Sequence, residues 1–119
     1  METKRKMIYL EPSIVSELDE FINKYVSNPR GRVINLIVSL FLLLDKKTQR
    51  HFEQRANQYI DSSTEISYGT KYGEKRKGKI EMQLFISHAL NEKFDEYNDK
   101  VLIIASLLYV GILKDKEGD

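Results

Sequence analysis

The rhythm of hydrophobic and polar positions changes near the start of the chain. Residues 5–10 alternate, so that odd positions form one face and even positions the other, which is typical of a half-buried β-strand. From Pro12 onward, apolar residues recur every three or four positions as far as Tyr25. This spacing predicts an amphipathic helix with Pro12 in its first turn, where a missing N–H costs nothing. The pattern therefore predicts a strand followed directly by a helix.

The next segment is apolar on almost every side. Residues 33–44 read VINLIVSLFLLL, and weaker helical spacing continues to Tyr59. We expect a long helix from about Val33 to about residue 59, with its first half buried all round. One strand and one amphipathic helix cannot cover such a helix, and an isolated strand lacks hydrogen-bond partners. Both elements need a second unit to pack against.

The same order of elements returns later in the chain. Residues 79–86 alternate strictly, residues 87–100 are amphipathic, and residues 101–113 are apolar almost throughout. The first helix of each half carries a similar tetrapeptide, LDEF at 18–21 and FDEY at 94–97. We therefore divide the chain into a first strand–helix–helix unit (1–58), a basic linker (59–78) and a second, degenerate unit (79–119).

Composition narrows the class of protein. The 119 residues suit one domain, and the absence of cysteine excludes disulfides and thiolate metal sites. The first residues lack the apolar core of a signal peptide and no apolar run is long enough to cross a bilayer. We expect a cytoplasmic protein of bacterial or archaeal type without membrane partners. The adjacent acids at 19–20 and 95–96 are expected to be solvated. No catalytic or metal-binding spacing is present, so we expect no enzyme activity, no cofactor and no small-molecule substrate.

Charge is unevenly distributed behind a net charge of +1. Residues 1–58 hold 10 Lys or Arg against 7 Asp or Glu, residues 59–79 hold 5 against 3, and residues 80–119 hold 4 against 8. Basic residues thus gather just before both predicted strands. This distribution fits a polyanionic partner, although an isoelectric point near 7.9 is less basic than that of strongly basic nucleic-acid-binding domains.

The segments RKMIYLEPSIVSELDEFI and RGRVINLIVSLFL resemble the ribbon-helix-helix family of DNA-binding proteins. The resemblance covers residues 4–45 well and 79–113 less well, because the second unit has a shorter first helix and almost no turn. It implies a mainly α fold, with an antiparallel two-stranded ribbon over an intertwined four-helix core. Two such motifs could pair within one chain as a pseudodimer, or between two chains as a homodimer. Pairing within the chain is slightly favoured, because it covers both apolar helices without a partner.

The resemblance also implies which residues would meet DNA. The outward face of the ribbon would read base edges in the major groove through Arg5, Met7, Tyr9, Gln83 and Phe85. Glu81 shares that face and would lie where phosphates approach. The start of the second helix and the basic clusters would contact phosphates through Lys4, Lys6, Arg30, Gly31, Arg32, Lys75, Arg76, Lys77 and Lys79.

These residues imply a sequence-specific double-stranded DNA-binding protein. Within the family the implied roles are transcriptional repression or autoregulation, including plasmid partition, conjugation and antitoxin operons. The competing hypothesis is a helical dimerisation or protein-interaction module that does not bind DNA. Arg5 and Tyr9 separate the two hypotheses, because only the first gives these outward side chains a binding role.

Overall fold

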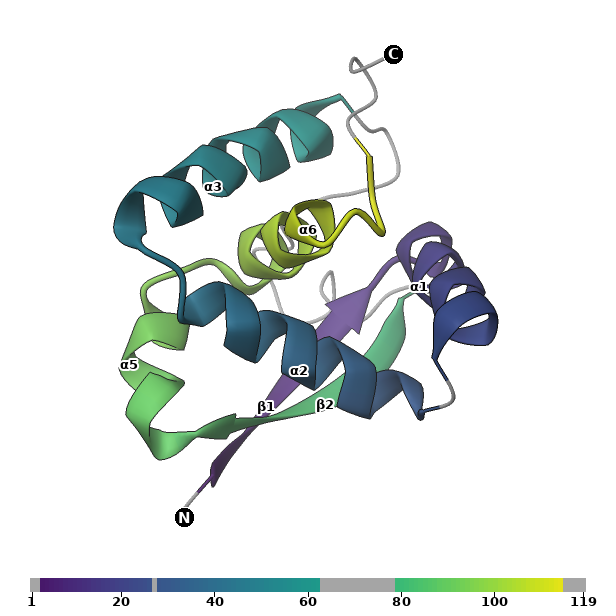
Figure 1. Ribbon diagram of the computed structural model, residues 1–119, viewed down its shortest axis with the longest axis horizontal. Coiled ribbons are helices and arrows are strands. Elements are labelled where there is room, and N and C mark those ends of the chain that lie inside the picture. Colours follow the sequence, from purple (N-terminus) through teal and green to yellow (C-terminus); the bar gives the residue numbers. More distant parts are fainter. Residues whose placement is uncertain (1–2, 27, 63–78, 115–119) are drawn as a thin grey trace.

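Seven elements make up the described parts of the chain, residues 3–26, 28–62 and 79–114 of a computed structural model (Figure 1). They are β1 (Thr3–Leu10), α1 (Pro12–Tyr25), α2 (Arg30–Leu42), α3 (Lys46–Asp61), β2 (Ile80–Ser87), α5 (His88–Asp95) and α6 (Asp99–Tyr109). The structure is mainly helical with one small antiparallel sheet. Most of the predicted linker, residues 63–78, lies outside the described residues.

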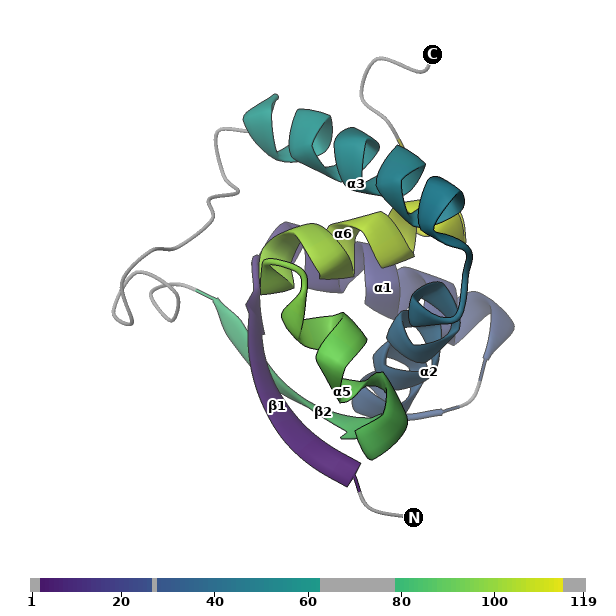
Figure 2. The same ribbon diagram turned by 90° about the vertical axis from the view of Figure 1, so that its left-hand side faces the viewer.

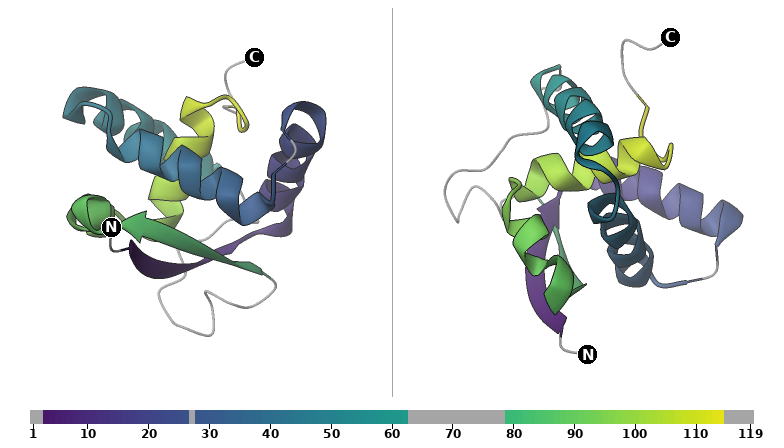
Figure 3. Two further views of the ribbon diagram at one scale, coloured as in Figure 1. Left: turned by 60° about the horizontal axis from the view of Figure 1, so that its bottom comes forward. Right: turned by 60° about the vertical axis from the view of Figure 1, so that its left-hand side comes forward.

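The sheet is a two-stranded ribbon in which β1 pairs with β2 of the same chain. The strands run antiparallel, and Met7 lies opposite Gln83 at the middle of the register. Its inward face is apolar and buried at Ile8, Leu10, Met82, Leu84 and Ile86. Figure 3 (left) shows α1, α2, α3 and α6 on one side of the ribbon, with its other broad face turned away from them. Both predicted strands and their inward faces are confirmed.

Equivalent positions of the two strand–helix units are separated by a constant number of residues. Pro12 and His88 begin the helices that follow the two strands, and these positions are 76 apart. Met7 and Gln83, which face each other in the ribbon, are also 76 apart. The second unit is shorter, because α5 has 8 residues where α1 has 14.

The helix α6 forms the centre of the helical side. All its residues from Lys100 to Leu108 are buried, because α2, α3 and β1 pack around it. Figure 2 shows α3 lying across α6 on the side away from the ribbon. The predicted burial of the second apolar helix is therefore confirmed. None of the described helices is both long and apolar enough to cross a membrane.

The first apolar helix differs from the prediction in its burial. One side of α2 faces the core through residues such as Ile34, Val38 and Phe41. The opposite side leaves Leu36, Leu40 and Leu43 exposed, at 59%, 47% and 65% of their surface. The expectation that this helix would be buried all round is wrong, because the described elements cover one side of α2 and leave the other open.

The predicted long helix to residue 59 is also wrong, because the chain breaks between α2 and α3. Asp45 caps the start of α3, where its carboxylate accepts hydrogen bonds from the backbone N–H and the hydroxyl of Thr48, at 3.1 and 2.6 Å. Lys46, the first residue of α3, forms an ion pair with Glu96 at the end of α5. The turn lets α3 fold back onto α6, which a continuous helix could not do.

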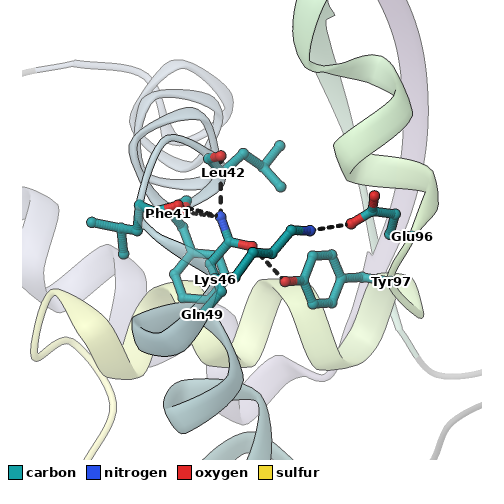
Figure 4. A network of polar contacts seen from close by, with 7 residues as sticks. Phe41, Leu42, Lys46, Gln49, Glu96 and Tyr97 are labelled. Carbon is teal, nitrogen blue, oxygen red and sulfur yellow. Dashed lines mark hydrogen bonds and ion pairs between the residues drawn. The ribbon is translucent and has the colours of Figure 1, made fainter.

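A buried glutamine completes this break (Figure 4). The Gln49 side-chain N–H₂ group donates to the backbone carbonyls of Phe41, Leu42 and Leu44, at 3.2, 3.1 and 2.8 Å. These carbonyls belong to the last turn of α2 and its exit, where helices leave acceptors without partners. The Tyr97 hydroxyl donates to the Gln49 side-chain oxygen at 2.6 Å, which joins the break to the second unit.

Candidate nucleic-acid interface

The outward face of the ribbon holds all five residues predicted to read bases. Together with Glu81 they form three cross-strand pairs, Arg5–Phe85, Met7–Gln83 and Tyr9–Glu81. The side chains of Arg5, Glu81, Gln83 and Phe85 are exposed, and those of Met7 and Tyr9 are partly exposed. We call these six residues the outward face. It brings together a guanidinium, a primary amide, a carboxylate and three large side chains able to contact base edges.

The two ends of the outward face carry opposite charges. Arg5 lies beside Phe85 at one end, and Glu81 lies opposite Tyr9 at the other. Phe85 is half exposed, so its ring is accessible to a binding partner. The face therefore presents a basic, aromatic end and an acidic end.

The helix α2 runs along the free edge of β2. The Asn35 side-chain oxygen accepts a hydrogen bond from the Phe85 backbone N–H at 2.8 Å. A methyl group added at Gly31 would lie 3.8 Å from the Gln83 carbonyl oxygen, an ordinary contact distance. The first turn of α2 is thereby held beside the outward face. Sequence reasoning missed the Asn35 contact, because a lone asparagine in an apolar helix gives no signal of its partner.

The start of α2 is an open, basic helix end. It begins after Pro29, and no side chain of the described residues caps it. Arg32 is exposed there, whereas the Arg30 guanidinium donates two hydrogen bonds to the Asp19 carboxylate, Nε–Oδ1 and Nη2–Oδ2 both at 2.8 Å. That hydrogen bonding raises the pKa of Arg30. The expectation that Asp19 is merely solvated is wrong, because it orients Arg30 at this helix end.

Two lysines expected to contact phosphates are instead held by carboxylates. Lys6, on the inward side of the ribbon, has its Nζ 2.7 Å from Asp95 Oδ1 and 5.2 Å from the centre of the Phe94 ring. Lys79 lies 3.4 Å from Glu11 Oε2 and its side chain is only 7% exposed. Asp95, expected to be solvated, thus has a partner. Neither lysine has the open exposure that a phosphate contact requires.

The opposite flank of the ribbon holds a buried ionic cluster. Lys100, in the first turn of α6, donates to the Tyr9 carbonyl at 2.9 Å and pairs with Glu11. Burial lowers the pKa of Lys100, and the hydrogen bond to Glu11 opposes that shift. Lys79 approaches the same carboxylate. The lysine side chain secures the free edge of β1. Nothing in the sequence indicated these Lys100 contacts, because Lys100 lies in a segment that reads as a polar turn.

The start of α6 is closed, unlike that of α2. The Asn98 side-chain oxygen accepts hydrogen bonds from the backbone N–H groups of Lys100 and Val101, at 2.9 and 3.4 Å. Asp99 adds an acid in the first turn. The two helix ends that flank the ribbon therefore differ in both capping and charge.

The remaining predicted contacts lie outside what the structure describes. Lys4 belongs to β1, but its side chain is not among the described ones, and Lys75, Arg76 and Lys77 fall within residues 63–78. Among the described residues, no three acidic or histidine side chains are grouped so as to hold a metal ion. Comparison of the chain with known protein families, characterised proteins and solved structures found no match.

Proposed function

We propose that this chain is a sequence-specific double-stranded DNA-binding protein with two ribbon-helix-helix motifs in tandem, acting as a transcriptional repressor or autoregulator. The observation that carries the proposal is the outward face, a two-stranded ribbon with exposed Arg5, Gln83 and Phe85 and no described helix over it. The shared offset of the two strand–helix units supports the tandem arrangement.

The ribbon suits the major groove of B-DNA, which is about 12 Å wide and admits two antiparallel strands. Arg5 would donate two hydrogen bonds to guanine, and Gln83 would bond adenine through its amide. Met7 and Phe85 would pack against thymine methyl groups. Phosphates on one side of the groove would meet the uncapped start of α2 and Arg32.

Selection from a randomised duplex pool, followed by fluorescence anisotropy on the enriched sequence, tests the proposal. We expect Arg5→Ala and Gln83→Ala each to weaken binding by about 5- to 150-fold, the range for loss of one bidentate base contact. The matched control is Arg50→Ala, which removes an exposed arginine from α3 on the helical side. Its affinity should stay within a factor of about two to three at fixed salt, a change below one lost phosphate contact.

Two results would refute the proposal. One is a pool from which wild-type protein enriches no sequence at low salt. The other is equal binding by the Arg5→Ala and Arg50→Ala variants, with unchanged circular dichroism showing that both are folded. Either result would leave the outward face without a base-reading role.

A second candidate function rests on exposed leucines in α2 and at its C-terminal cap position. Leu36, Leu40 and Leu43 follow one another at helical spacing on a face that no described element covers. Such a stripe favours a helical dimerisation or protein-interaction module without DNA binding. Sedimentation equilibrium tests it, since the chain mass is 14.0 kDa. This candidate requires an assembly that Leu36→Gln with Leu40→Gln dissociates and that Tyr25→Ser, an exposed aromatic on α1, leaves intact.

A further inference from the structure

We propose, on the basis of the proposed function, that the ribbon reads an asymmetric DNA site in which Arg5 binds guanine and Glu81 binds cytosine. The two reading positions lie about four base-pair steps apart. The target therefore carries guanine at both ends of a five-base-pair core on the same strand, G-N-N-N-G, in place of the palindromic G-N-N-N-C.

Arg5 and Glu81 occupy equivalent positions in the two halves of the ribbon. The register is centred on Met7 and Gln83, which are 76 positions apart. Arg5 and Glu81 are also 76 positions apart, and each lies two residues before its central residue. A two-fold axis through the centre of the ribbon would exchange them. Because these two symmetry-related positions carry opposite charges, the ribbon should not recognise a two-fold symmetric DNA sequence.

Both side chains are available for this role. Arg5 and Glu81 are exposed, and no ion pair or side-chain hydrogen bond holds either one within the described residues. Arginine donates to the two acceptors of guanine in the major groove, and a carboxylate accepts from the amino group of cytosine. The positively charged side chain thus selects guanine, and the negatively charged one selects cytosine.

Strand geometry sets the spacing. Glu81 lies opposite Tyr9, four residues along β1 from Arg5. Antiparallel strands rise about 3.4 Å per residue, so the two readers lie about 14 Å apart. That length matches about four steps of B-DNA at about 3.4 Å each along a strand.

The two-fold axis of the ribbon determines which DNA strand each side chain contacts, and therefore the base sequence of the site. If Arg5 contacts guanine on one strand, the equivalent Glu81 contacts the symmetry-related position on the other strand. Cytosine at that position pairs with guanine on the first strand, which gives G-N-N-N-G. Two arginines would instead select G-N-N-N-C.

The flanks of the ribbon are asymmetric in the same sense. Within the described residues, the start of α2 has no side-chain cap and carries exposed Arg32. At the start of α6, by contrast, Asn98 forms a cap and Asp99 adds negative charge. Phosphate contacts should therefore be stronger on the α2 side.

Sequencing of duplexes enriched from a fully randomised pool, by the full-length protein, tests the inference through the correlation between the two end positions. Wild-type protein should enrich G-N-N-N-G, and defined duplexes should show about 5- to 150-fold weaker binding to G-N-N-N-C, the usual cost of one wrong base pair. Glu81→Arg should reverse this preference. Glu17→Arg, an equal charge change on an exposed acid of α1, should strengthen binding to both duplexes without reversing the preference.

Glu81→Gln provides a second, milder variant should Glu81→Arg fail to fold. It removes the carboxylate and should reduce the discrimination between the two duplexes at least about 3-fold. Enrichment of G-N-N-N-C by wild-type protein, or an unchanged preference in both Glu81 variants, overturns the inference and leaves the proposed function standing. Enrichment of no sequence at all overturns the proposed function instead.

Discussion

Replacing Gln49 with alanine should destabilise the fold far more than its place in a polar helix suggests. Gln49 is 1% exposed, and its side-chain nitrogen donates to three backbone carbonyls. The Phe41 carbonyl also accepts from the Leu44 backbone N–H, so the main loss falls on Leu42 and Leu44. A buried acceptor without a donor costs about 1–3 kcal/mol, and the partial burial of the Leu44 carbonyl and water entering the vacated space reduce the total for the two. We expect the free energy of unfolding to fall by about 2–4 kcal/mol.

Urea denaturation followed by circular dichroism measures this change directly, provided that the slope with denaturant is unaltered. The control is Gln54→Ala, the same substitution at an exposed position of the same helix, which should shift the free energy by less than about 0.5 kcal/mol. Equal stabilities of the Gln49→Ala and Gln54→Ala variants would refute the reasoning. That result would mean that the carbonyls at the end of α2 find equivalent donors without the glutamine.

Two further predictions concern charged groups. Glu11→Gln leaves Lys100 buried without its carboxylate and should cost about 3–5 kcal/mol of unfolding free energy, whereas Glu20→Gln, on an exposed acid of α1, should change little in the same urea titration. A cost below about 1 kcal/mol would show that the cluster opens to solvent. Hydrogen bonds from Thr48 lower the pKa of Asp45 below its usual 3.8. The stability that Asp45 contributes is therefore complete above that value and lost as pH falls through the lowered pKa. Asp45→Asn should flatten this acid dependence, and parallel curves of stability against pH for wild type and variant would contradict the assignment.

Local periodicity was sufficient to predict both strands, the start of α1 at Pro12 and the burial of α6. It failed between α2 and α3, because Asp45 and Gln49 lie within a pattern that still has helical spacing. The break depends on capping bonds to residues elsewhere, including Tyr97 in the second unit. The exposed side of α2 was also unpredictable, since leucine at a surface position cannot be distinguished from core leucine by sequence pattern.

The outward face could be predicted from alternation alone, because side chains on a strand point to opposite sides in strict order. The sequence did not show which basic side chains lack a carboxylate partner. Lys79 and Arg30 read as exposed basic residues, and Lys6 as an inward-facing cation at the frayed end of the ribbon. Each instead has a carboxylate partner brought near by tertiary packing. Asp19 and Asp95 were the corresponding misjudged acids. The DNA-binding roles of the outward residues stay predictions until duplex binding is measured.

Because β1 and β2 belong to one polypeptide, the ribbon does not fall apart on dilution. A reader assembled from two identical chains exists only above its dissociation constant, so its occupancy of DNA rises with the square of the protein concentration at low expression. Under the proposed function, occupancy of DNA by this single-chain ribbon should rise in simple proportion to the protein present. A joined ribbon also keeps its two strands together in the presence of related chains, because the linked strand is always at high effective concentration.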